Sequence, residues 1–110
     1  MARIVRGFKA QVTVLDGNDD TKATDAFDLE GNRHFAVNIA TISGGTGTFI
    51  TTVQQSFDGG TTWLAFASAL TISQVGTLED KVTVARHIRV RVSTAEGGAA
   101  SIRVRIHSKP

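Results

Sequence analysis

The chain contains no cysteine, no tyrosine, one tryptophan and a single proline, which is its last residue. Without cysteine it can form neither a disulfide nor a thiolate metal site. No apolar run approaches the roughly 18 residues that a membrane-spanning helix needs. The first residues are basic, but they lack the apolar segment and the small-residue cleavage site of a signal peptide. We therefore expect no disulfide framework, no membrane partner and no secretion signal.

Helical periodicity is also absent, because no segment keeps apolar residues at helix spacing over several turns. The 110 residues instead show two-residue alternation, many Thr and Val, and glycine pairs that are typical of turns. Charged residues make up 20% and apolar residues 41%, which is the composition of a globular domain. The sequence predicts an all-β fold, a single-domain antiparallel β-sandwich of about eight strands over residues 1–110, with a β-barrel as the alternative.

The expected strands are short and are separated by polar or glycine-rich segments. They cover Ile4–Leu15, Phe27–Leu29, His34–Ile42, Thr48–Phe57, Thr61–Ala67, Leu70–Ile72, Lys81–Ala85 and two strands within 86–94 and 100–108. In the first of them Phe8, Ala10, Val12 and Val14 alternate with polar residues. This alternation predicts a half-buried strand whose four apolar side chains face the core.

The stretch SFDGGTTW fits the pattern Ser-x-Asp-x-Gly-x-Thr-Trp at every fixed position. Asp58 can accept hydrogen bonds from backbone N–H groups about two residues further on. Gly60 can adopt a positive φ, and the hydroxyls of Ser56 and Thr62 can tie the two arms together. Trp63 is expected to anchor the next strand in the core. Each fixed residue therefore has a local structural task in a hairpin turn.

This stretch resembles the Asp-box of sialidases and related β-propellers. In those families the box repeats once per blade, on the turn between two strands and away from the catalytic centre. It occurs once here, and one box cannot build a propeller. The resemblance therefore implies a structural turn and no activity. The alternative is a calcium or sugar site at Asp58, but not an EF-hand, because the ligand spacing of that motif is missing.

Basic and apolar residues alternate in two segments near the C-terminus, RHIRVRVST and ASIRVRIHS. Matching their apolar faces predicts a hairpin in which Val92 pairs with Ile102. The same register places three like pairs opposite one another on the other face: Arg91 with Arg103, Arg89 with Arg105, and His87 with His107. Like charges directly opposite destabilise a sheet by roughly 0.2–1 kcal/mol per pair. We therefore expect this basic face to contact acidic groups.

Three environments are open to such a face: solvent, with the arginine stems covering apolar surface, an acidic protein surface, or nucleic acid. A net charge of only +2 and the lack of aromatic residues between the arginines argue against nucleic acid. The expected partner is an acidic protein surface, such as a major capsid protein or a neighbouring copy of the chain. An acidic loop that contains Asp16, Asp19, Asp20 and Asp25 could supply it between copies, head to tail, in a homo-oligomer.

Motifs that carry chemistry are missing. His34, His87 and His107 lie on separate expected strands, and no pair of them has metal-ligand spacing. There is no nucleophile motif, P-loop or dinucleotide fingerprint. We therefore expect a non-enzymatic protein with no cofactor and no metal.

Small, cysteine-free, Thr- and Gly-rich all-β chains with an S-x-DGG-x-TW turn resemble accessory structural proteins of tailed bacteriophage virions. The head-decoration or cement proteins are the nearest analogy, and neck and tail components come next. The resemblance implies a β-sandwich, made in the host cytoplasm, that stabilises a virion shell by protein contacts, often as an oligomer. The alternative is a carbohydrate-binding β-sandwich. Such modules present exposed aromatic residues, whereas Phe35 and Phe57 occupy strand positions and are expected in the core.

Overall fold

The chain is seen in a computed structural model that describes residues 9–16, 22–42, 49–73, 76–95 and 101–110. Within these ranges no helix is long and apolar enough to cross a membrane. The strands are β1 (Lys9–Asp16), β2 (Phe27–Asp28), β3 (His34–Thr41), β4 (Phe49–Ser56), β5 (Leu64–Ser73), β6 (Gly76–Val82), β7 (His87–Ala95) and β8 (Ser101–Lys109).

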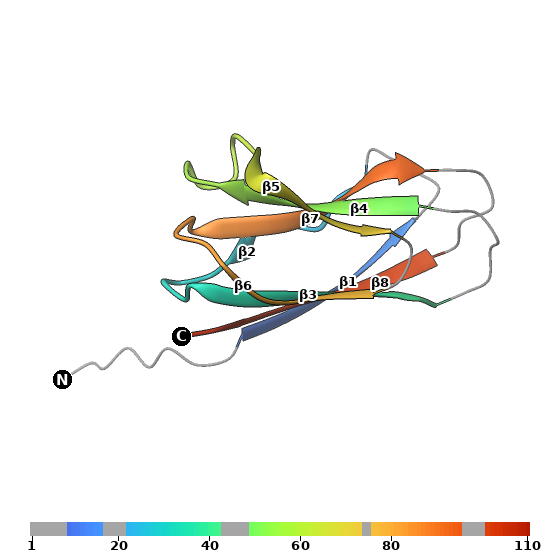
Figure 1. The fold of residues 1–110 in the computed structure, drawn as a ribbon, viewed down its shortest axis with the longest axis horizontal. Coiled ribbons are helices and arrows are strands. Elements are labelled where there is room, and N and C mark those ends of the chain that lie inside the picture. The colour runs from blue at the N-terminus through green and yellow to red at the C-terminus, as the bar shows by residue number, and fades with distance from the viewer. Residues whose placement is uncertain (1–8, 17–21, 43–48, 74–75, 96–100) are drawn as a thin grey trace.

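The strands form two antiparallel sheets that lie one above the other (Figure 1). The first sheet has the order β1-β8-β3-β6, and the second sheet has the order β2-β7-β4-β5. The prediction of an all-β sandwich is thereby confirmed. In this order the first strand pairs with the eighth, the second with the seventh, the third with the sixth and the fourth with the fifth. Such nested pairing across two sheets is the strand order of a jelly roll.

The nested pairing is equivalent to one long two-stranded ribbon folded over itself. Its closed end is the turn between β4 and β5, which are the only consecutive strands among those described that share a sheet. Every other pair of consecutive described strands is divided between the two sheets. The connections between consecutive strands therefore lead from one sheet to the other. Most strand pairs join segments that are distant in the sequence.

The prediction that the two basic strands form a hairpin is wrong, because they belong to different sheets. β7 pairs with β2 and β4 in the second sheet, whereas β8 pairs with β1 and β3 in the first. The apolar side chains of the two strands do meet, but they meet face to face across the core rather than edge to edge. The arginines of β7 and β8 therefore point to opposite sides of the molecule.

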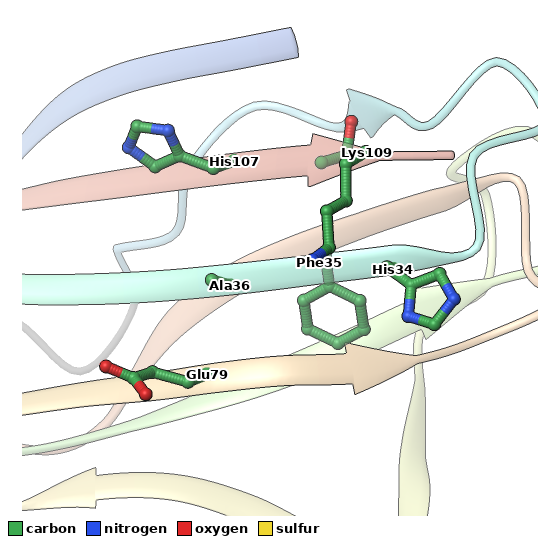
Figure 2. A pocket seen from close by; sticks show the side chains of 7 residues that line it. His34, Phe35, Ala36, Glu79, His107 and Lys109 are labelled. Atoms are coloured by element: carbon green, nitrogen blue, oxygen red, sulfur yellow. The ribbon is translucent and has the colours of Figure 1, made fainter. Parts of the chain in front are cut away.

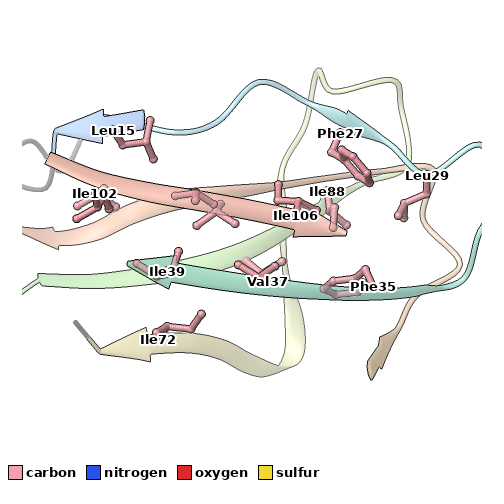
Figure 3. Close-up of a cluster of buried hydrophobic side chains, with 14 residues drawn as sticks. Leu15, Phe27, Leu29, Phe35, Val37, Ile39, Ile72, Ile88, Ile102 and Ile106 are labelled. Carbon is pink, nitrogen blue, oxygen red and sulfur yellow. The ribbon is translucent and has the colours of Figure 1, made fainter. Parts of the chain in front are cut away.

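The core lies between the sheets and consists of alternate residues from nearly every strand (Figure 3). Its fully buried members include Val37 and Val53, together with six inward apolar residues of β7 and β8: Ile88, Val90, Val92, Ile102, Val104 and Ile106. Burying one such side chain stabilises the fold by about 1.5–3 kcal/mol. Phe35 extends this core and contacts the ring of Phe66 with a centroid separation of 5.9 Å.

The orientation of β1 is the reverse of the predicted one. Val12 and Val14 are each 59% exposed, and Ala10 is exposed as well, whereas Leu15 is buried. The other inward side chains, Lys9, Gln11 and Thr13, are polar, and Lys9 Nζ donates a 2.6 Å hydrogen bond to the carbonyl of Asp28.

A second polar contact holds β1 in this orientation, because Gln11 Nε2 donates to the carbonyl of Asp25 at 3.4 Å. The chain that follows β1 thus covers the inner side of this strand with backbone carbonyls, which polar side chains can satisfy and valines cannot. Phe8, the fourth residue of the predicted apolar face, lies outside the described residues.

Two strand boundaries also differ from the expected ones. The expected segments Thr61–Ala67 and Leu70–Ile72 are replaced by one strand, β5, which begins at Leu64. It is interrupted by a bulge where Val53 pairs with Leu70 and the next residue, Gln54, pairs with Ala65. The strand expected over Lys81–Ala85 begins and ends earlier, at Gly76 and Val82. The merger reduces the nine expected segments to the eight observed strands.

The orientation of β1 predicts unequal costs for two chemically identical substitutions. Val104→Ala removes fully buried methyl groups and should reduce the free energy of unfolding by about 1–3 kcal/mol. Val14→Ala removes mostly exposed ones and should stay within about 0.5 kcal/mol of the wild type. Urea unfolding followed by circular dichroism measures both values. Equal losses at the two positions would contradict the observed face assignment.

Candidate functional site

The Ser56–Trp63 turn closes the ribbon, and its side chains bond to its own backbone. Asp58 Oδ1 accepts hydrogen bonds from the N–H groups of Thr61 at 3.2 Å and Thr62 at 2.8 Å, which are three and four residues further on. Ser56 Oγ donates to the same carboxylate at 2.8 Å and accepts from the N–H of Gly60 at 2.9 Å. The carboxylate is therefore already occupied by donors of the turn.

Backbone conformation supports the same interpretation. Gly59 and Gly60 have φ values of 77° and 94°, a region that L side chains rarely adopt. The hydrogen bonds from the backbone and hydroxyl of Thr62, followed by that from Ser56, lower the pKa of Asp58 to about 2. Among the described residues no group of three or more His, Asp or Glu side chains could hold a metal ion. The turn has the geometry expected of a structural element.

Trp63 does not occupy the predicted place in the core. Its ring is half-buried, and the Arg89 guanidinium carbon lies 4.5 Å from the ring centroid. Arg89 Nε in turn donates to Gln54 Oε1 at 2.8 Å. Because Arg89 and Gln54 face outward from the second sheet, the indole covers the outside of that sheet. The Arg89 guanidinium therefore covers a face of the Trp63 ring on which a sugar could otherwise stack.

The basic residues of β7 are engaged within the molecule. Arg89 contacts Gln54 and Trp63, and burial, together with the charge of Arg91, lowers its pKa. His87 Nε2 lies 3.8 Å from Asp28 Oδ2. These three residues of β7 were predicted to lie opposite basic residues of β8, but they lie opposite polar residues of β4. Arg91 pairs with Thr52, Arg89 with Gln54 and His87 with Ser56.

The basic residues of β8 have a different environment. Arg103 lies between Val14 and Ala40, Arg105 between Val12 and Asn38, and His107 between Ala10 and Ala36. Within the described part of the chain, no carboxylate lies at ion-pair distance from Arg103 or Arg105. Alternate residues of a strand share a face, so these three basic side chains form one row.

We call this surface the β8 face. It consists of the outward side chains of three neighbouring strands: Ala10, Val12, Val14, Ala36, Asn38, Ala40, Arg103, Arg105 and His107. Exposed valines border the basic row on one side, and mostly small residues border it on the other. Sequence reasoning missed the valines. The adjacent pair Val14-Leu15 was the available signal, because two neighbouring apolar residues must point to opposite faces.

A shallow hollow of about 260 Å³ marks one end of the β8 face. Figure 2 shows His107 on β8, His34 and Ala36 on β3, and Glu79 on β6 around it. The hollow exists because Ala36 is small and its neighbours are long. It gives one end of the β8 face relief.

Two acidic residues that follow the predicted acidic loop, Asp28 and Glu30, form ion pairs within the molecule. Asp28 Oδ2 forms an ion pair with Arg86 Nη2 at 3.2 Å. The hydrogen bond from Arg86 is the main cause of the lowered pKa of Asp28. Glu30 lies 3.3 Å from Lys9 Nζ. Asp16 and Asp25 are exposed, whereas Asp19 and Asp20 lie outside the described residues.

Comparison with known proteins found no relative. No family model matches the chain, and neither any curated protein nor any solved structure does. The functional argument therefore depends on the surface itself.

The lowered pKa of Asp58 predicts a pH dependence of stability. The folded pKa of about 2 lies below the ordinary value of 3.8. The charged carboxylate therefore stabilises the fold above pH 3.8, and this contribution is lost as the pH falls towards 2. We expect Asp58→Asn to lower the melting temperature at pH 6 and to flatten its fall over that acid range. Calcium should leave both proteins unchanged; a calcium-dependent rise that only the wild type shows would establish a metal site instead.

Proposed function

We propose that the protein is a non-catalytic structural component of a tailed bacteriophage virion. It decorates the capsid and attaches through the β8 face to an acidic surface of the shell. The sequence features that support this proposal are the composition and the S-x-DGG-x-TW turn. The structural feature that carries it is the row of Arg103 and Arg105 beside two valines that are each 59% exposed.

Apolar and arginine side chains together are the composition of protein interfaces, where Arg is enriched and Lys, Asp and Glu are depleted. Arg103 and Arg105 can each fork onto a carboxylate with two parallel hydrogen bonds. Val12 and Val14 would be removed from water in the same contact. A surface that only served solubility would need neither exposed valines nor guanidinium groups that lack a carboxylate partner among the described residues.

The jelly-roll order itself does not select a function, because viral capsid domains and lectins both use it. Two side chains bear on the carbohydrate-binding alternative. Arg89 covers Trp63, which argues against sugar stacking there. Phe57 is 58% exposed, although its strand position predicted burial, and it borders a depression of about 370 Å³ with Phe66, Val82 and Val84. A glycan that shifted the resonances of Phe57 would favour that alternative.

The location of the protein is the direct test. Particles of the phage that encodes the chain are purified through a density gradient, and the chain is sought by mass spectrometry and by antibody labelling in electron micrographs. We expect label spread over the capsid. Label confined to the neck or tail would move the protein to that part of the virion, and its absence from particles would overturn the proposal.

The β8 face predicts a charge-reversal effect. Arg103→Glu with Arg105→Glu should fold normally, because both side chains point away from the core. Binding to shells that lack the protein should weaken at least tenfold, about 1.4 kcal/mol. Rising salt should also weaken wild-type binding. Co-sedimentation with the shells measures both effects.

A matched control separates this surface from net charge. Lys22→Glu with Arg33→Glu makes the same change in charge at two exposed positions outside the β8 face. This variant should bind within about twofold of the wild type. Equal losses in the two double variants would show that overall charge, and not the β8 face, determines binding.

A further inference from the structure

The strand β1 forms one edge of the first sheet. Among the described strands it pairs with β8 alone, in an unbroken register from Lys9 to Asp16. No charged residue and no proline lies between those two ends. An edge strand of this length presents a row of backbone N–H and C=O groups to which another strand can bind.

The other described edges are less suited to pairing. β2 has only two residues, and the pairing of β5 with β4 is interrupted by a bulge. The pairing of β6 with β3 is also irregular, and β6 carries the charged residues Glu79 and Lys81. Short strands, bulges and charges are the devices by which proteins protect sheet edges. β1 is thus the long, regular and unprotected edge of the described sheets.

We propose that β1 binds β1 of a second copy of the chain, antiparallel and about a two-fold axis at Thr13. The faces of the two sheets fix this register. Outward residues must lie opposite outward residues, because a slip by one position would place Val12 against an inward polar side chain. Centring on Thr13 places Val12 opposite Val14 of the partner subunit, which makes two valine pairs. Centring on Val12 would match the faces over the same length, but it would place Val14 opposite Ala10 of the partner subunit and leave one valine pair.

The chemistry of the strand is complementary to itself in this register. No like charges of the two strands lie directly opposite each other, because Asp16 lies opposite Ala10 of the partner subunit and Lys9 points inward to Glu30. On the outer surface, each row of side chains across the joined sheets contains four residues in order: Arg105, Val12, Val14 of the partner subunit and Arg103 of the partner subunit. Valines directly opposite one another are favourable cross-strand pairs, and the apolar strip lies between arginines.

This dimer does not depend on the proposed attachment to a shell. It joins the two first sheets edge to edge and leaves both β8 faces pointing to the same side. A strand from a different protein could occupy the same edge, but it would not share the two-fold register. The dimer is measured with the chain alone, so its failure and the failure of shell binding are separate results.

The test uses analytical ultracentrifugation across the micromolar range. We expect the wild type to dimerise. In Val12→Lys with Val14→Lys, lysines lie directly opposite lysines, and the dissociation constant should rise at least about tenfold. In Val12→Lys with Val14→Glu, each lysine lies opposite a glutamate, and the dimer should be retained. Val82→Lys with Val84→Lys changes two exposed valines away from β1 and should leave the dimer intact.

A second variant keeps the test decisive if the two-lysine protein folds poorly. The chain has no cysteine, so Thr13→Cys places a single thiol on the proposed axis. Mild oxidation should yield a disulfide-linked dimer, whereas Val84→Cys should form no disulfide-linked dimer, because its thiol lies away from the axis. A monomeric wild type, or a two-lysine variant that dimerises like the wild type, would overturn the dimer. A lysine–glutamate variant that dissociates would overturn the register.

Discussion

The packing of β7 against β8 across the core is the contact on which the rest of the structure depends. Three inward apolar side chains of β7 and three of β8 are completely buried, and they come from opposite sheets. Once these two strands face each other, their outward arginines must point away from one another. One basic row then lies beside Trp63 and Gln54, where it is used internally, and the other lies in the open next to the valines of β1.

Local features of the fold could be predicted from the sequence, because they depend on nearby residues. The all-β class, the sandwich, the approximate number of strands and the geometry of the Ser56–Trp63 turn follow from alternation and turn chemistry. The partner of each strand does not, because the inward residues of β7 and β8 fit a hairpin and a face-to-face contact equally well. The repulsion between Arg91 and Arg103 in the hairpin register was evidence against the hairpin: separating the strands into two sheets removes it.

The surface was harder to predict than the core, because the orientation of β1 depends on residues that follow it. Alternation in this strand is symmetric, and either face could have been buried. The backbone carbonyls of Asp25 and Asp28 decide the matter by accepting hydrogen bonds from Gln11 and Lys9. Trp63 was misplaced for a similar reason, since its environment is provided by Arg89, a residue of a different strand. Both errors concern contacts between segments that the sequence does not show to be neighbours.

The pairing of the first strand with the last has a consequence for how the protein is made. Lys9 is paired with Ser108, so the first sheet cannot be completed until β8 has left the ribosome. The closed end of the ribbon at Asp58 is the only local pairing that can form earlier among the described strands. Folds dominated by such distant pairings acquire their structure slowly. During synthesis the valine-rich first strand therefore waits without its partner, and the chaperones of the producing cell would encounter it before β8 does.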